Sequence, residues 1–190
     1  MKNKSVYFLT QTSIIAALYA VLTILQATLF PESTSAAIKF RASEALTVLA
    51  LFTPAAVPGL TLGCVLANLS SFAVLGPLDM IFGSVASLLA AVTMYLLRNA
   101  RLFSLPVFAC LMPALFNGLI VGFEIAFFFT DGGFTLTGFL FSGGFVAIGE
   151  LAVLFVLGLP LSVFSKSQSS PKSSLSNADA LSVDNSFNKV

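Results

Sequence analysis

Four carboxyl side chains and two asparagine side chains lie inside, or at the ends of, long apolar stretches of the 190-residue sequence. They are Glu44, Asn68, Asp79, Asn117, Glu124 and Glu150. An ionisable group at membrane depth is costly and usually faces a cavity or a charged partner. A carboxylate accepts two hydrogen bonds side by side, which suits an amidine-like edge such as that of a guanine-like ring. The set therefore favours capture of a small solute that is rich in hydrogen-bond donors or positively charged.

Three of the four acids also have simpler interpretations that need no ligand, and Glu150 is the exception. The alternative for Glu44 is a plain ion pair with Arg41, and the alternative for Asp79 is an N-terminal helix cap. Glu124 lies near the end of its stretch, and the alternative for this residue is that its carboxylate simply reaches the membrane interface. Glu150 lies about 13 residues into its stretch, roughly 20 Å from the outer end, so it is the hardest to explain without a ligand.

The composition excludes most soluble classes of protein. Hydrophobic residues make up 57% of the chain and charged residues 9%, and the mean hydropathy is +1.00. A soluble domain carries about 25% charged residues, and a chain of this length cannot hide so much apolar surface in one aqueous core. The solvent is therefore a lipid bilayer, which rules out a soluble enzyme, a nucleic-acid binder and a secreted disulfide scaffold.

Residues for catalytic and cofactor chemistry are also sparse. The chain has no histidine, and therefore neither a histidine base nor a histidine metal ligand. Cys64 and Cys110 both lie in apolar runs, where a cysteine usually acts as a small hydrophobic residue. The sequence has no phosphate-binding Gly-x-x-x-x-Gly-Lys-Ser/Thr motif, so ATP-driven transport would need a separate ATPase subunit. We therefore predict a binding subunit without a cofactor, and not an enzyme.

Six apolar segments are expected to form the transmembrane helices of an all-α membrane protein. The block 42–75 is too long for one helix across the ~30 Å hydrocarbon layer, and Pro54 and Pro58 split it into two short spans. The other four segments are 7–30, 79–97, 103–130 and 137–164. Residues 165–190 include nine serines and no apolar run, so they are predicted to form a disordered tail after a membrane domain of residues 1–164.

The positions of the basic residues support this number of spans. With six spans and a cytoplasmic N-terminus, seven Lys and Arg residues lie on the cytoplasmic side and two on the outside. The cytoplasmic ones are Lys2, Lys4, Arg98, Arg101, Lys166, Lys172 and Lys189, and the outer ones are Lys39 and Arg41. This distribution obeys the positive-inside rule and predicts that both termini are cytoplasmic.

Small residues recur every four positions along three of the segments. The longest series is Ala55, Gly59, Gly63, Ala67 and Ser71, and the shorter ones are Ala16 with Ala20 and Gly118 with Gly122. Such series let helix backbones approach closely within a membrane. Two interpretations are open: packing inside this protein's own bundle, or a docking face for a membrane partner.

Five short motifs make the sequence similar to one family of transport proteins. They are Phe-Arg-Ala-Ser-Glu-Ala-Leu at 40–46, Pro-Ala-Ala-Val-Pro-Gly at 54–59, Gly-Pro-Leu-Asp at 76–79, Asn-Gly-Leu-Ile-Val-Gly at 117–122 and Ala-Ile-Gly-Glu at 147–150. Over about residues 8–164 the chain resembles the QueT family, which are substrate-binding S components of energy-coupling factor (ECF) transporters.

The resemblance implies a six-helix S-component bundle in the bacterial plasma membrane, with a ligand held near the outer surface by the loop after the first helix and by helices four to six. It implies a queuosine precursor, a 7-deazaguanine, as cargo. It also implies a transmembrane T protein and two cytoplasmic ATPases as partners, docked through small residues of the first helix that match Ala16 and Ala20. The ligand-binding residues carried over by motif position are Arg41, Glu44, Asp79, Asn117 and Glu150, and Glu124 and Asn68 are further candidates.

Two other functions stay open at this point. One is a proton- or ion-coupled secondary carrier that works as a dimer and uses Glu150 as its proton site. The other is an S component for a different vitamin, since one fold serves several ligands. The chain has no Trp, so stacking on a flat ligand would fall to Phe or Tyr.

Overall fold

The computed structural model describes residues 3–30, 41–70, 72–100, 106–130, 133–158 and 160, and all secondary structure in these ranges is helical. The α-helices are α1 (Lys4–Leu29), α2 (Ala56–Ser70), α3 (Phe72–Leu96), α4 (Val107–Phe128) and α5 (Leu136–Val153). A 3₁₀ helix, η2 (Ala42–Leu51), comes between α1 and α2. A short η3 (Leu97–Asn99) extends α3, and a π-helical turn, η4 (Leu154–Gly158), extends α5. The predicted tail, 165–190, lies outside the described residues.

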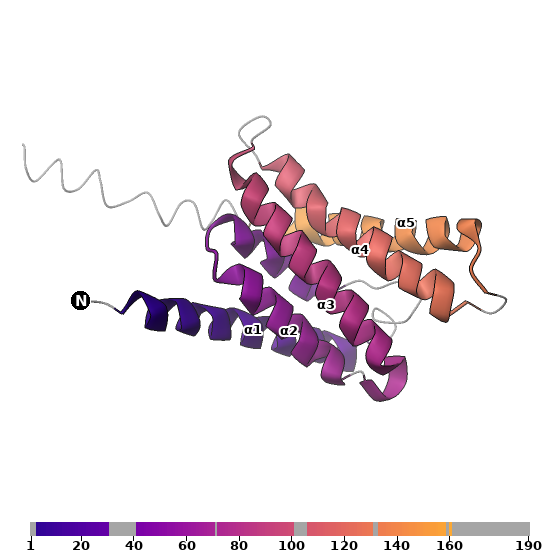
Figure 1. The fold of residues 1–190 in the computed structure, drawn as a ribbon, viewed down its shortest axis with the longest axis horizontal. Helices are drawn as coiled ribbons and strands as arrows, with labels where there is room; N and C mark the ends of the chain where they lie inside the picture. The colour runs from indigo at the N-terminus through magenta and orange to yellow at the C-terminus, as the bar shows by residue number, and fades with distance from the viewer. Residues whose placement is uncertain are drawn as a thin grey trace, which may run out of the picture.

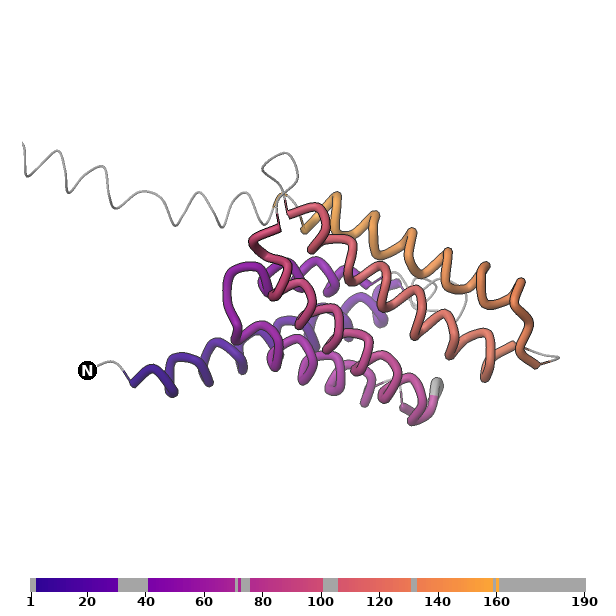
Figure 2. The backbone as a smooth tube through the Cα atoms, turned by 45° about the horizontal axis from the view of Figure 1, so that its top comes forward, coloured from indigo at the N-terminus to yellow at the C-terminus, as the bar shows by residue number. Residues whose placement is uncertain are grey.

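The α-helices lie side by side in the order in which they occur in the chain. Figures 1 and 2 show α3 between α2 and α4, with α1 on the far side of α2 and α5 on the far side of α4. The 3₁₀ helix η2 contacts all five α-helices and also η4. The two outer helices, α1 and α5, are therefore both in contact with η2.

Four helical segments are long and apolar enough to cross a membrane: Lys4–Leu29, Gly76–Asn99, Val107–Phe128 and Leu136–Gly158. The other two, η2 and α2, are apolar but have only 10 and 15 residues. They rise about 20 Å as 3₁₀ helix and about 22 Å as α-helix, against ~30 Å of hydrocarbon. Six main helices are thus confirmed within the described ranges, whereas only four of them have the length of a full span.

Proline and glycine mark the breaks between helices. The chain breaks between η2 and α2, as predicted from Pro54 and Pro58, and Pro58 falls in the first turn of α2, where its missing N–H is tolerated. The predicted end of the block 42–75 coincides with a kink in α3, which begins at Phe72 but whose membrane-length part begins at Gly76. Gly76 then interrupts α3 with a φ of +75°, a backbone conformation that glycine adopts at little cost.

Glycines set the distance between neighbouring helices at two places. A Cβ on Gly63 would lie 2.7 Å from Tyr19 Cβ, so α2 has room only for glycine there against α1. A Cβ on Gly122 would lie 2.4 Å from Gly143 Cα, which makes the α4–α5 contact equally tight. At these positions the small residues serve packing inside the protein's own bundle. Ser71, the last residue of the longest series, lies outside the described residues.

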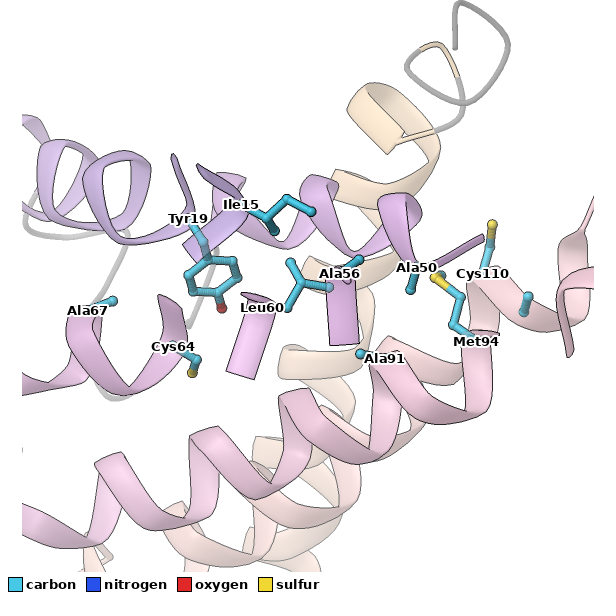
Figure 3. Close-up of a cluster of buried hydrophobic side chains, with 11 residues drawn as sticks. Ile15, Tyr19, Ala50, Ala56, Leu60, Cys64, Ala67, Ala91, Met94 and Cys110 are labelled. Carbon is cyan, nitrogen blue, oxygen red and sulfur yellow. The ribbon is translucent and has the colours of Figure 1, made fainter. Parts of the chain in front are cut away.

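The buried apolar core has two parts. The larger part, shown in Figure 3, contains Ile15, Tyr19, Ala50, Ala56, Leu60, Cys64, Ala67, Ala91, Met94, Ala109 and Cys110. The smaller part joins α3, α4 and α5 and contains Ala86, Val121, Ile125 and Val146. Large apolar side chains are also exposed along every α-helix, far beyond the patches that soluble monomers leave open. This exterior suits a lipid environment.

Candidate ligand-binding site

Five of the residues predicted to bind a ligand line one buried site. They are Arg41, Glu44, Asp79, Asn117 and Glu150, and Gly83, Ser87, Val121 and Val146 complete the lining. Arg41 comes just before η2 and Glu44 is on η2, while the other three predicted residues come from α3, α4 and α5. Segments up to 109 positions apart in the sequence, from 41 to 150, thus converge on one point.

Arg41 is held in place at one edge of the site. Its Nη2 donates to Asn68 Oδ1 at 2.9 Å and forms an ion pair with Asp79 Oδ2 at 3.4 Å. Asn68 Nδ2 in turn donates to the backbone carbonyl of Asp79 at 3.1 Å. Asn68 therefore acts through Arg41 and Asp79, and it lies outside the lining itself.

The charge of Arg41 is secure in this setting. Burial by itself lowers the pKa of the guanidinium, but neighbouring groups, Asp79 and Glu44 among them, raise the pKa by more. The net pKa is above the ordinary value, so Arg41 stays positively charged. Within the described ranges, no three His, Cys, Asp or Glu side chains are grouped so that they could hold a metal ion.

Glu44 is hydrogen-bonded to Tyr19 instead of forming the ion pair with Arg41 that was the alternative interpretation of its sequence position. The hydroxyl of Tyr19 on α1 donates to Glu44 Oε1, while the ion pair that the structure shows for Arg41 is with Asp79. The interpretation of Glu44 as a plain partner of Arg41 is therefore wrong. The Glu44 side chain is 2% exposed.

Glu150 is bound by an amide across the α4–α5 contact. Asn117 Nδ2 donates to Glu150 Oε1 at 2.9 Å, and both residues are buried. The other carboxylate oxygen, Glu150 Oε2, is buried without a hydrogen-bond partner among the residues that the structure describes, and the same holds for Glu44 Oε2. Each of the two carboxylates therefore has one oxygen engaged and one oxygen available to a ligand.

Glu124 is placed differently. It is on α4, seven residues after Asn117, and is fully buried, with 0% exposure. It does not line the site with the other acids. The alternative that its carboxylate simply reaches the membrane interface does not fit a side chain enclosed in the bundle.

The predicted docking residues of α1 face inward. Ala16 and Ala20 are 6% and 7% exposed, and the Ala16 carbonyl oxygen is 2.9 Å from where a Cβ on Gly63 would lie. Their outer neighbours Ser13 and Ala17 are exposed. The surface of α1 that a partner can reach is therefore the face that carries Ser13 and Ala17, beside the buried face of Ala16 and Ala20.

Sequence reasoning missed Tyr19 and Ser87. Ser87 lines the site from α3, and Tyr19 holds Glu44 from outside the lining. A signal for Tyr19 is the i, i+4, i+7 spacing of Tyr19, Thr23 and Gln26, which puts three polar side chains on one face of α1.

These features together define a class: a multi-pass helical membrane protein with a buried carboxylate-rich site. Residues 9–167 match the family model of the QueT transporters, and the chain belongs to this family. The resemblance noted from the motifs is thereby confirmed, and the chain is a membrane transport protein.

The chain is also similar to a curated relative. The queuosine precursor transporter QueT of Lactococcus lactis subsp. cremoris (strain MG1363) is 30% identical over 167 residues, which cover 82% of this chain and 90% of the relative. No solved structure matches the chain.

Proposed function

We propose that this chain is the substrate-binding S component of an ECF-type importer in the bacterial plasma membrane, and that it captures a queuosine precursor, a 7-deazaguanine, from outside. The observation that carries the proposal is the buried site in which Glu44 and Glu150 each keep one oxygen without a hydrogen-bond partner among the described residues. The name of the Lactococcus relative supports the class of ligand.

The two available oxygens suit a ligand with hydrogen-bond donors at two ends. A buried acceptor without a partner costs about 1–3 kcal/mol, and more when it is charged, so a ligand that supplies donors is favoured. A 7-deazaguanine has one donor edge, formed by N1–H and the exocyclic amine, and an aminomethyl group on C7 adds a cation. We assign the guanine-like edge to Glu150, with Asn117 available to the ring carbonyl, since an amide both donates and accepts.

The cation is assigned to Glu44 rather than Asp79. Asp79 already faces Arg41 at 3.4 Å, so its charge is balanced within the protein. Glu44 is bound by a neutral hydroxyl, that of Tyr19, which leaves its negative charge uncompensated by a close ion pair. An ammonium group beside Glu44 Oε2 would offset the cost of burying this charge.

Binding must widen the site. The free volume between the lining side chains is about 10 Å³, which is roughly the room of one water molecule. A bicyclic base is several times larger than that. We therefore propose that lining side chains, or the elements that carry them, move outward when the ligand enters.

The energy for release is proposed to come from partner subunits. The chain has no phosphate-binding loop, so we infer a transmembrane T protein and two cytoplasmic ATPases as its partners. We place the docking surface on α1, now on the exposed face that includes Ser13 and Ala17, beside the buried Ala16 and Ala20. Both termini are proposed to be cytoplasmic, from the distribution of Lys and Arg.

Titration calorimetry of the purified chain with 7-aminomethyl-7-deazaguanine tests the ligand assignment. Glu150→Gln keeps the shape of the side chain but puts a donor where an acceptor is needed. A charge-assisted hydrogen bond contributes about 1.5–3 kcal/mol, so affinity should fall roughly 10- to 150-fold. Glu124→Gln makes the same chemical change at a buried carboxyl of α4 outside the lining, and should matter less. Unchanged affinity in Glu150→Gln would remove this residue from the site.

A secondary carrier with Glu150 as its proton site is the competing function, because this carboxyl is buried inside the site. The two functions differ in what drives uptake. Uptake of the same deazaguanine by cells that lack an ECF module, abolished by a protonophore, would favour the carrier. Uptake that requires the module would favour the S component.

A further inference from the structure

Three hydrogen bonds join one face of α1 to the first three residues of η2. They run from Tyr19 Oη to Glu44 Oε1, from Thr23 Oγ1 to Ser43 Oγ at 2.7 Å, and from the Ala42 backbone nitrogen to Gln26 Oε1 at 2.7 Å. In this series, Glu44 is the residue of η2 that lines the ligand-binding site. The Tyr19 hydrogen bond is thus the one that bears directly on the ligand.

The Tyr19 ring is fixed firmly. Its side chain is fully buried, and Figure 3 shows it extending from α1 into the larger core cluster with Leu60 and Cys64. On its backbone side it lies against Gly63, where a Cβ would come within 2.7 Å of Tyr19 Cβ. Because the ring is enclosed in this way, the position of its hydroxyl group is fixed.

We propose that Tyr19 is a positioning residue for ligand binding, whose hydroxyl orients the Glu44 carboxylate so that Oε2 faces the ligand. The inference rests on the proposed function, because it takes Glu44 as a ligand contact. Tyr19 is outside the lining of the site, so it acts through Glu44.

The physical reason is the freedom of an unheld carboxylate. The last torsion of a glutamate is broad, with little intrinsic preference for one orientation. Arg41 lines the same site and offers Glu44 a charged alternative partner. Without the Tyr19 hydroxyl, the Glu44 carboxylate would turn toward Arg41 and present less of its charge to the ligand.

The test is Tyr19→Phe, which removes one oxygen and keeps the packed ring. Calorimetry with 7-aminomethyl-7-deazaguanine should show affinity lowered on the order of tenfold, the low end of the 10- to 100-fold that hydrogen-bond partners of metal ligands contribute. The matched control is Thr23→Val, which removes the next hydrogen bond of the same series, and a local one to the backbone carbonyl of Tyr19, without touching Glu44. Its affinity should stay within about twofold of the unmodified chain.

A double-mutant comparison separates positioning from general packing. In a Glu44→Ala background, Tyr19→Phe should change affinity by no more than about twofold, because the hydroxyl has no carboxylate left to orient. Equal losses in Tyr19→Phe and Thr23→Val would overturn the proposal, and so would a Tyr19→Phe chain that melts far below Thr23→Val. Unmodified chain that does not bind the probe would contradict the proposed function instead.

Discussion

The α4–α5 contact provides a sharp test of how the site is held together, through the substitution Gly122→Ala. The added Cβ would lie 2.4 Å from Gly143 Cα and 2.8 Å from Gly143 N. Carbon atoms in ordinary contact are about 3.5–4.0 Å apart. Because the obstacle is backbone and not a flexible side chain, the two helices must separate by about 1 Å at this point.

The separation would reach the ligand-binding site. Asn117 and Glu150 lie on the same two helices and are joined by a hydrogen bond of 2.9 Å. An increase of about 1 Å takes this bond beyond the usual 2.7–3.2 Å range. Overpacking typically costs about 1–3 kcal/mol of stability. Loss of a hydrogen bond to a charged group costs about 1.5–3 kcal/mol, so we expect ligand affinity to fall at least tenfold.

Gly144→Ala is the matched control for this experiment. A Cβ on Gly144 has no atom within 4 Å, although Gly144 is the neighbour of Gly143 on α5. Replacing glycine by alanine inside a helix is favourable by up to about 1 kcal/mol when nothing clashes. Melting temperature in detergent and calorimetric affinity should therefore fall for Gly122→Ala and stay level or rise for Gly144→Ala. Equal behaviour of the two variants would refute the close-contact reasoning.

Two further predictions concern topology and docking. Asn99→Cys, in η3 before α4, and Thr137→Cys, in the first turn of α5 after α4, should be labelled from opposite sides of the membrane. Labelling of both from outside would contradict the proposed six-span topology. Ala17→Leu, on the exposed face of α1, should weaken co-purification with the proposed T protein and leave ligand affinity nearly unchanged. Ala16→Leu, on the buried face, should instead lower the melting temperature, with an overpacking cost of about 1–3 kcal/mol.

Part of the lining was predictable from sequence because buried charge is rare in apolar segments, although the same rule also selected Glu124, which lies outside the lining. Glu44, Asp79 and Glu150 stand out against their neighbours by residue type alone, and the structure brings all three into one lining. The break at Pro54 and Pro58 was predictable for a similar reason, since proline has a fixed local effect on a helix.

The pairing within the site was not predictable in the same way. Arg41 and Glu44 are three residues apart, yet Arg41 forms its ion pair with Asp79, because η2 and α3 meet there in space. Tyr19 taken alone reads as an ordinary core residue, and only its spacing with Thr23 and Gln26 points to a polar face of α1. The 3₁₀ conformation of η2 also has no clear local cause in the sequence, and η2 is in contact with every α-helix of the bundle. These features depend on tertiary contacts.

The hydrogen bonds of the site divide the bundle into two halves. Glu44 accepts a hydrogen bond from Tyr19, so that one of the two carboxylates that we propose as ligand contacts is held within the unit of α1 and η2. Glu150 is oriented by Asn117, so that the other belongs to the unit of α4 and α5. Each carboxylate therefore keeps its orientation if the two units move apart, which matters because the free volume of the site is only about 10 Å³.

Two polar contacts to Asp79 must adapt to such a movement: the hydrogen bond from Asn68 Nδ2 to its backbone carbonyl at 3.1 Å, and the ion pair with Arg41. The ion pair joins the start of η2 to α3, which lies between the two halves. At 3.4 Å it is longer than an ordinary N–H···O hydrogen bond of about 2.7–3.2 Å. Arg41 would retain Asn68 as a partner if this contact opened, since that hydrogen bond is made to α2, at 2.9 Å. The boundary at which we propose that the site widens is therefore crossed by this long ion pair and by the hydrogen bond between Asn68 and Asp79, whereas the contacts that orient the two carboxylates lie within each half.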